Sequence, residues 1–176
     1  MNLNLVAREK FLNDAAACSV CPDQYTEWMK LYLDNSFLNR FFDDPTLGAN
    51  KLERDILLRV LEQTHTSDIQ LVNSSIIEFE NARNTFPERK QFVEQVMKSA
   101  PIFQNYTERD IQRAQELVAT CKLSLYDARH VAVAETAQVD FFLTCDYDLV
   151  KKYQGTLNVM TPVAFANYYD QHYEKH

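Results

Sequence analysis

Glycine is almost absent from this chain of 176 residues, which contains only Gly48 and Gly155. Dinucleotide-binding folds and P-loop folds need several closely spaced glycines, because their backbone turns tightly around a phosphate group. The sequence therefore excludes a nucleotide cofactor held by a loop of that kind.

Positive charge is also scarce, since 18 Lys and Arg face 25 Asp and Glu and leave a net charge of -7. A protein that holds a polyanion by bulk charge alone carries the opposite sign. This composition excludes such a protein but leaves room for a local basic rim. A cluster of acids that binds divalent cations would explain part of the acidic excess.

Long apolar runs are missing as well, and no stretch approaches the ~20 residues that span a bilayer. The N-terminal segment is interrupted by charged residues from Arg8 to Asp14, unlike a secretory signal. We therefore expect a cytoplasmic protein with no membrane partner.

Cysteine is limited to four residues, which we expect to be free thiols in a reducing compartment. Cys18 and Cys21 form a C-x-x-C, but a zinc site needs a second close pair of Cys or His. The sequence offers only the scattered Cys121 and Cys145.

What the chain does contain is an alternation of short apolar strands with helical patterns. We predict four strands, at residues 28–34, 69–72, 141–144 and 157–160. The segments between them have helical periodicity, as in residues 49–63. This order predicts a three-layer α/β/α sandwich with a mainly parallel central sheet. Ligands bind such sheets outside the carboxyl ends of the strands.

The length predicts one compact domain. We place it at residues 29–170, after an extension of unknown role at residues 1–28 and before a tail at residues 171–176. The segment from Asp43 to Asp68 looks like a long insertion within this domain.

Acidic residues follow two of the predicted strands directly. Asp34 ends the first strand and Asp146 follows the third. Each of them also fits the N-cap of the next helix, and Asp148 fits the first helical turn, where the helix dipole favours an acid.

Two further acids lie in the helix after the second strand. Ser75 and Glu78 have the spacing of a capping box, in which the glutamate returns to the serine backbone. Glu80 has no such explanation, so we favour Glu80 over Glu78 as a ligand.

Asp127 forms a similar capping pattern with Ser124 at the start of a helix. The stripe that continues from Asp127 runs through Val131 and Ala134, so the carboxylate leaves from a face that packs inward. Such a partly desolvated acid is tolerable when it is paired or bound to a metal. His130, one turn further on, is either a hydrogen-bonded structural histidine or a neighbour behind a ligand.

All of these acids fall at the ends of strands or at the starts of helices that can meet at one sheet edge. Oxygen-only clusters of Asp and Glu select hard divalent cations such as Mg²⁺ or Mn²⁺. Such ions hold a phosphodiester, activate water and stabilise the departing oxygen. The pattern therefore favours phosphodiester hydrolysis.

The sequence resembles the PIN-domain family of metal-dependent ribonucleases, which includes the VapC toxins, from residue 29 to about 168. Four segments carry the resemblance: LYLDNSFLNRFF, LVNSSIIEFE, SLYDARHVAVAE and FFLTCDYDLVKK. It implies a parallel sheet between helices, Mg²⁺ or Mn²⁺ as cofactor, and RNA cleavage. The extension at residues 1–28 and the segment from Asp43 to Asp68 depart from a minimal VapC toxin.

Residue by residue, the resemblance implies four catalytic metal ligands: Asp34, Glu80, Asp127 and Asp146. A shifted alignment would choose Glu78 in place of Glu80. Secondary positions are the hydroxyl of Ser36, the peripheral acid Asp148, and Thr144, which would position water or metal. We expect the RNA phosphates to meet basic residues close to these ligands: Arg40, Arg83, Arg129, Lys151 and Lys152.

Two other classes of protein do not fit the residues present. A phosphatase with an aspartate nucleophile would need a second acid at the position of Ser36, and a receiver domain would need an acidic pair where LYLDNS has one acid. The open alternative is a non-catalytic PIN-fold module that binds RNA or protein. A toxin would have an antitoxin partner, and a homodimer is compatible with the general preference of oligomers for symmetry.

Overall fold

The computed structural model describes residues 28–66 and 69–173. The elements of this part follow in chain order: β1 (Met29–Leu33), α2 (Asn35–Leu38), the 3₁₀ helix η1 (Asn39–Phe42), α3 (Gly48–Thr66), β2 (Ile69–Ser74), α4 (Ser75–Ala82), α5 (Pro87–Lys98), β3 (Ile102–Gln104), α6 (Glu108–Cys121), α7 (Leu125–Thr136), β4 (Phe141–Leu143), α8 (Tyr147–Lys152), β5 (Asn158–Met160) and α9 (Pro162–His172).

The strands form one five-stranded sheet in the order β3-β2-β1-β4-β5, and every neighbouring pair is parallel. Leu33 pairs with Leu143 at the carboxyl ends of β1 and β4. This register brings Asp34, which follows the central strand β1, and Thr144, which follows its neighbour β4, to the same point of the sheet edge.

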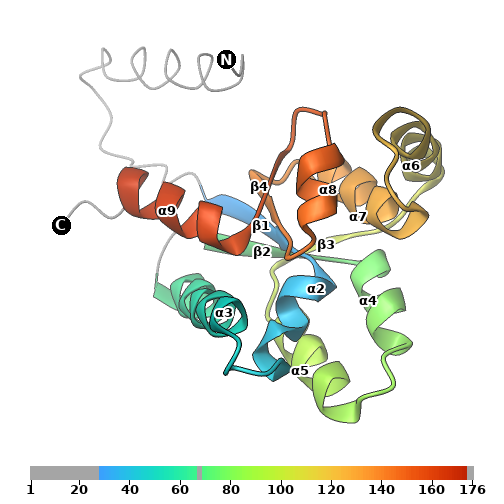
Figure 1. Cartoon of the computed structure of the whole chain (residues 1–176). Helices are drawn as coiled ribbons and strands as arrows, with labels where there is room; N and C mark the ends of the chain where they lie inside the picture. The colour runs from blue at the N-terminus through green and yellow to red at the C-terminus, as the bar shows by residue number, and fades with distance from the viewer. Residues whose placement is uncertain (1–27, 67–68, 174–176) are drawn as a thin grey trace, which may run out of the picture.

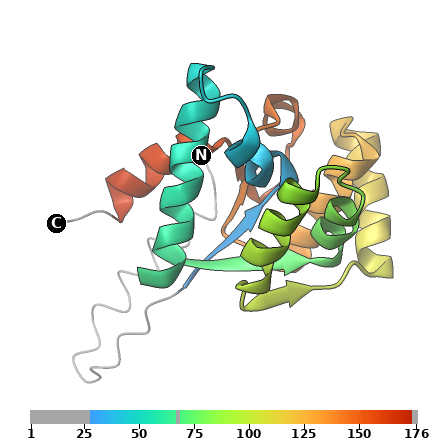
Figure 2. The same ribbon diagram turned by 90° about the horizontal axis from the view of Figure 1, so that it is seen from below.

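Helices cover both faces of the sheet, as Figures 1 and 2 show: α6 and α7 lie on one side, and α3 and α9 on the other. Side chains alternate along each strand and so serve both layers. Tyr32 and Phe142 stack on each other on the side of α7, where Tyr32 meets His130, whereas Phe141 contacts Phe165 of α9. The predicted α/β/α fold with a parallel sheet is confirmed.

The core runs through both layers. Helix α7 contributes a continuous run from Val131 to Ala134 that is fully buried, as the four consecutive apolar residues predict. The same helix carries Asp127 in its first turn. A helix held on most sides fixes the position of any functional group at its start.

Two local predictions are wrong. The strand β3 was not expected, because it is a three-residue edge strand whose side chains are half-buried or exposed, which leaves no clear alternation to detect. The capping box of Ser75 and Glu78 does not form. Ser74 is the N-cap of α4 and accepts from the Ile77 amide, while the Ser75 hydroxyl accepts from the Tyr106 amide.

The predicted extension lies outside the described residues except for Trp28, and so do Cys18 and Cys21. The domain division therefore stays a prediction. Cys121 and Cys145 are free cysteines. Within the described part of the chain, no helix has both the length and the apolar character needed to cross a membrane.

Candidate functional site

A cleft of about 490 Å³ opens at the carboxyl ends of β1 and β4. All four predicted ligands line it, although they come from four different elements or their caps. The acids of the cleft are Asp34, Glu80, Asp127 and Asp146, together with Asp43; its other lining residues are Asn35, Ser36, Asn39, Arg40, Asn84, Phe86, Arg89, Tyr126 and His130.

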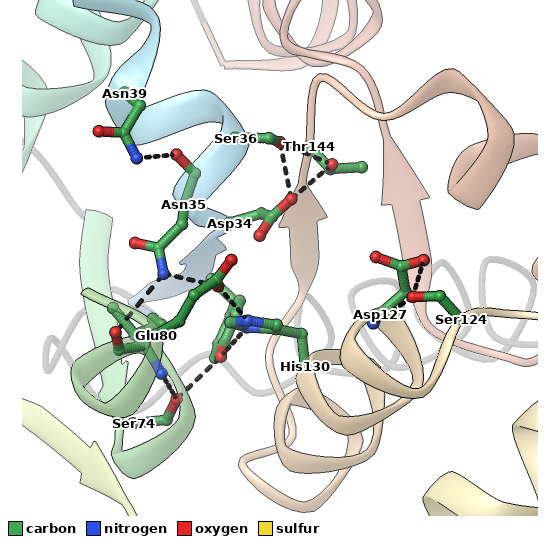
Figure 3. A network of polar contacts seen from close by, with 12 residues as sticks. Asp34, Asn35, Ser36, Asn39, Ser74, Glu80, Ser124, Asp127, His130 and Thr144 are labelled. Atoms are coloured by element: carbon green, nitrogen blue, oxygen red, sulfur yellow. Dashed lines mark hydrogen bonds and ion pairs between the residues drawn. The ribbon is translucent and has the colours of Figure 1, made fainter. Parts of the chain in front are cut away.

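Asp34 follows β1 and is held in place from β4. Its Oδ2 accepts hydrogen bonds from the Ser36 hydroxyl at 2.7 Å and from the Thr144 hydroxyl at 2.8 Å, and its backbone amide donates to Leu143 at 3.0 Å. Thr144 is fully buried. Figure 3 shows these two side-chain contacts, which orient the carboxylate of Asp34.

Glu80 reaches the cleft from the second half of α4. Its Oε2 accepts from the Asn35 amide at 2.7 Å and from His130 Nε2 at 2.8 Å. Since a carboxylate only accepts hydrogen bonds, His130 is the donor of this contact. Two side chains from α2 and α7 therefore orient one oxygen of Glu80.

His130 belongs to a buried chain of polar groups behind Glu80. Its Nδ1 lies 2.8 Å from the Tyr32 hydroxyl, which lies 2.8 Å from the Ser74 hydroxyl. Ligand-type atoms of Asp34, Glu80 and His130 lie within 4.8 Å of one another. Both ring nitrogens of His130 already have partners, so its role is to orient Glu80 rather than to bind a metal.

Asp127 and Asp146 complete the acidic lining from the starts of α7 and α8. Asp127 accepts from the Ser124 hydroxyl at 2.6 Å through Oδ2. Asp146 caps α8, because its Oδ1 accepts from the amides of Asp148 and Leu149 at 2.8 and 3.0 Å. Local capping thus sets the direction of both side chains.

The four acids share one feature: each uses a single oxygen for hydrogen bonds within the protein. Among the described residues, no donor contacts Oδ1 of Asp34, Oε1 of Glu80, Oδ1 of Asp127 or Oδ2 of Asp146. Each carboxylate is anchored by one oxygen and has the other available for a ligand. Converging carboxylate oxygens are the donors that hard divalent cations prefer.

The pKa values follow from this crowding. Burial raises the pKa of Asp127, and the negative charges of Asp146 and Asp34 raise it further against the hydrogen bond from Ser124. Burial also opposes ionisation of Glu80, but hydrogen bonds from His130 and Asn35 outweigh it and lower the pKa. The pKa of buried His130 is raised, since the contact with Glu80 and the charge of Asp34 overcome the cost of burial. Negative charge is therefore concentrated in the cleft.

The secondary predicted residues divide into two groups. Ser36 lines the cleft and Thr144 supports Asp34 from below. Glu78 instead accepts from Asn73 and lines a separate pocket between α4 and α5. Asp148 is exposed on α8 and pairs with Lys152 at 3.2 Å.

The basic residues predicted to contact RNA also divide. Arg40 lines the cleft but is engaged by Asp43 and Glu53, each at 2.7 Å. Arg83 lines an adjoining pocket, and the Arg129 guanidinium lies 5.8 Å from the centre of the Tyr126 ring. The two remaining residues, Lys151 and Lys152, lie on α8 and do not line the cleft.

Sequence reasoning missed several residues of the cleft. These are Asn35, Asn39, Asp43, Asn84, Phe86, Arg89 and Tyr126. Asn35 and Tyr126 are direct neighbours of predicted ligands, a signal that could have found them. The other five lie on η1 or directly after it, in the loop before α5 and in α5, and η1 packs against both α2 and α5.

No protein-family model matches the chain, and no curated protein matches it. Solved structures do. The chain is similar to VapBC from Salmonella typhimurium bound to DNA, with a TM-score of 0.52 and 12% identity over 76% of this chain and 98% of that chain.

Two further solved structures are similar to the chain to about the same degree. One is VapBC2 from Rickettsia felis bound to a DNA fragment from its promoter, with a TM-score of 0.50 and 10% identity over 76% of this chain and 98% of that one. The other is VapC20 from Mycobacterium tuberculosis, described as a toxin that cleaves the sarcin-ricin loop, with a TM-score of 0.50 and 13% identity over 72% and 98%. At these identities the likeness shows the fold alone, and the predicted PIN-like fold is confirmed.

Proposed function

We propose that the protein is a metal-dependent endoribonuclease that hydrolyses RNA phosphodiesters. The observation that carries this proposal is the convergence of four carboxylates, Asp34, Glu80, Asp127 and Asp146, on one cleft at the carboxyl edge of a parallel sheet. Each of them has one oxygen without a protein donor among the described residues. These four residues are the proposed metal ligands.

The donor set fits Mg²⁺ or Mn²⁺. It consists of carboxylate oxygens, with no thiolate among the cleft residues and with both nitrogens of His130 already in hydrogen bonds. Zinc and copper sites draw more on nitrogen and sulfur. When bound, the ion would supply the charge that holds the phosphodiester, activates water and stabilises the departing oxygen.

The chain's own groups would keep the ligands in place before RNA arrives. Ser36 and Thr144 hold Asp34, while Asn35 and His130 hold Glu80. Ligands oriented by hydrogen bonds of this kind lose less freedom when the ion binds, and loss of such support typically lowers metal affinity 10–100-fold. The rigid support therefore favours a binding site over a chance cluster of acids.

The fold supports RNA as the substrate. VapC20, which has the same fold, is a toxin that cleaves the sarcin-ricin loop, and the resemblance to PIN-domain ribonucleases implies RNA cleavage. The net charge of -7 argues that binding of RNA depends on the metal and on local basic residues rather than on bulk charge.

The test is cleavage of end-labelled RNAs, one structured and one unstructured, in Mn²⁺ or Mg²⁺ and in EDTA. Wild type should cut internally only with the metal. Glu80→Gln and Asp127→Asn should lose at least 100-fold in rate, because each removes a charged ligand at the reacting centre. Glu78→Gln is the matched control, since it makes the same change two residues away and outside the cleft.

Cleavage that survives in both Glu80→Gln and Asp127→Asn would overturn the proposed site. Binding of Mn²⁺ without cleavage of any RNA would favour the alternative, a PIN-fold module that binds RNA or protein without cutting it. Failure of the folded protein to bind Mn²⁺ would contradict the metal site itself.

We also propose that the protein acts as the toxin of a toxin–antitoxin pair, since structures of VapBC complexes share its fold. Induced expression in a bacterial host should then arrest growth, and Asp34→Asn should abolish the arrest. Growth that is equally slow with both proteins would contradict a toxin. The antitoxin and the homodimer remain predictions.

A further inference from the structure

The acidic cleft continues into a second pocket of about 350 Å³. Five residues line both spaces: Asn35, Asn39, Glu80, Asn84 and Tyr126. Asn81 and Arg83 line only the second pocket. A strand whose phosphate lies at the acids therefore has a polar path past Glu80 toward Arg83.

Two exposed aromatic rings line this continuous space. Phe86 is 62% exposed and precedes α5, and Tyr126 is 50% exposed and stands in the first turn of α7. Single exposed rings are common on protein surfaces. These two line one acidic cleft and come from different parts of the chain.

Each ring is accompanied by an arginine. The Arg89 guanidinium lies 5.4 Å from the centre of the Phe86 ring, and that of Arg129 lies 5.8 Å from the Tyr126 ring. The amide of Phe86 donates to Asn84 Oδ1 at 3.0 Å, which orders the loop that carries the ring. Each ring therefore has a cationic neighbour in the protein.

Charge is arranged to suit a nucleic-acid strand on this path. Among the described residues, Arg83 lines the second pocket and has no carboxylate partner, so its charge is available to phosphates. Arg129 lines neither space. Base stacking on aromatic rings beside a basic groove is how proteins bind single strands without reading their sequence.

We propose that Phe86 and Tyr126 are stacking positions for unpaired bases of an RNA strand whose phosphate lies at the acids. The choice of RNA rests on the proposed function; the stacking positions rest on the two rings. Duplex RNA keeps its bases paired and stacked internally, and so cannot use them.

The test is fluorescence anisotropy with a labelled unstructured oligoribonucleotide and wild-type protein in Ca²⁺, which we expect to fill the site without supporting cleavage. Phe86→Ala and Tyr126→Ala should each weaken binding about 5–100-fold. Tyr126→Phe should stay within about twofold, because it keeps the ring. Phe103→Ala is the control, since Phe103 is 47% exposed on β3 and lines neither space.

A strand with abasic sites at the central positions separates stacking from other effects. It should bind wild type and both alanine variants with the same low affinity. A duplex of the same sequence should bind wild type weakly and show no dependence on either ring. Two results would overturn the stacking positions. One is that Phe86→Ala and Tyr126→Ala bind the intact strand as well as Phe103→Ala does. The other is that they weaken binding of the abasic strand as much as binding of the intact strand.

A DNA strand of the same sequence tests the choice of RNA. If the protein binds this DNA as tightly as the RNA, or more tightly, the choice of RNA is wrong. Failure of this inference is distinguishable from failure of the proposed function. Metal-dependent cleavage with fully active ring variants would retain the nuclease and reject stacking. Ring-dependent binding with no cleavage would retain stacking and reject the nuclease. Unchanged Mn²⁺ affinity in Tyr126→Ala would show that the neighbouring Asp127 is undisturbed.

Discussion

Two successive helices begin with the same local pattern, yet the structure uses their acids differently. Thr107 caps α6 with Asp110 three residues later, and Ser124 caps α7 with Asp127 three residues later. Asp110 is fully buried, and its two oxygens accept from the amide and hydroxyl of Thr107 and from the hydroxyl of Thr136. Asp127 lines the cleft and uses one oxygen.

The contrast extends to the surroundings of each acid. Near Asp110, Glu135 also has both oxygens in use, one with Arg113 Nε at 2.6 Å and the other with the Arg113 Nη2 and the Tyr153 hydroxyl. Buried acids that stabilise the fold have their oxygens hydrogen-bonded within the protein. The four proposed ligands in the cleft each keep one oxygen without a donor among the described residues, and they converge on one space.

Substitution of the two matched aspartates should separate these roles most strongly. Asp110→Asn should lower the free energy of unfolding by about 3 kcal/mol, because an amide nitrogen replaces an acceptor among buried donors. Asp127→Asn should change it by less than about 0.5 kcal/mol in EDTA. Urea unfolding measures both. Equal destabilisation by the two substitutions would erase the distinction.

Metal binding should sharpen the same comparison. Mn²⁺ at 100 times its dissociation constant should stabilise the wild type by about 2.7 kcal/mol, since it binds only the folded state. Thermal unfolding with Mn²⁺ and with EDTA measures this difference. Asp110→Asn should keep the stabilisation, and Asp127→Asn should lose most of it. If Asp110→Asn lost the stabilisation and Asp127→Asn kept it, the metal would not bind in the cleft.

Two tyrosine hydroxyls, that of buried Tyr32 and that of half-buried Tyr153, offer a smaller test. Tyr32→Phe removes the bridge between His130 and Ser74, and Tyr153→Phe removes the contact with Glu135. Each should lower the free energy of unfolding by about 1–2 kcal/mol. Only Tyr32→Phe should weaken Mn²⁺ binding, by about 10-fold, because it loosens the support of Glu80. Titration calorimetry measures the Mn²⁺ affinity of both variants. An equal loss of affinity in Tyr153→Phe would argue against a role of Tyr32 in supporting Glu80.

The smallest effect is a dependence of stability on pH in EDTA. The pKa of Asp127 is raised from 3.8, so the folded state binds the extra proton and wild-type stability falls as pH rises from that value through the raised pKa. Asp127→Asn should therefore gain stability relative to wild type across this range. The pKa of Glu80 is lowered from 4.5, so its contribution is present above 4.5 and is lost as pH falls through the lowered pKa.

Glu80→Gln should accordingly lose stability relative to wild type as pH rises toward 4.5 and above. Urea unfolding at closely spaced pH values compares the two variants. If the stability of both variants relative to wild type changed with pH in the same direction, the opposite pKa shifts of Asp127 and Glu80 would be contradicted.

Much of the fold was accessible from local sequence signals. The alternation of apolar strands with helical patterns predicts the parallel sheet, and the buried run from Val131 to Ala134 predicts a covered helix. The edge strand β3 was not accessible, because its three side chains are half-buried or exposed. Edge strands are defined by their neighbour, here β2, rather than by their own composition.

The candidate site was accessible in part. The resemblance to PIN domains predicts the four acids, and the structure brings all of them to one cleft. The distinction between Glu78 and Glu80 was predicted for a reason that fails, since the capping box of Ser75 does not form. The actual reason is that Glu80 faces Asn35 and His130, while Glu78 faces Asn73.

By itself, the sequence determined the classes of site that this protein cannot build and the positions where its chain changes from strand to helix. Two glycines exclude a phosphate-binding loop, and hydroxyl residues before acids mark the starts of α6 and α7. Only the tertiary structure decided which of those acids faces a ligand. The reason is that Thr136 satisfies Asp110 from 26 residues away, whereas Asp127 meets the charges of Asp34 and Asp146 from other elements. Capping depends on neighbours in the chain, but the availability of an oxygen depends on neighbours in space.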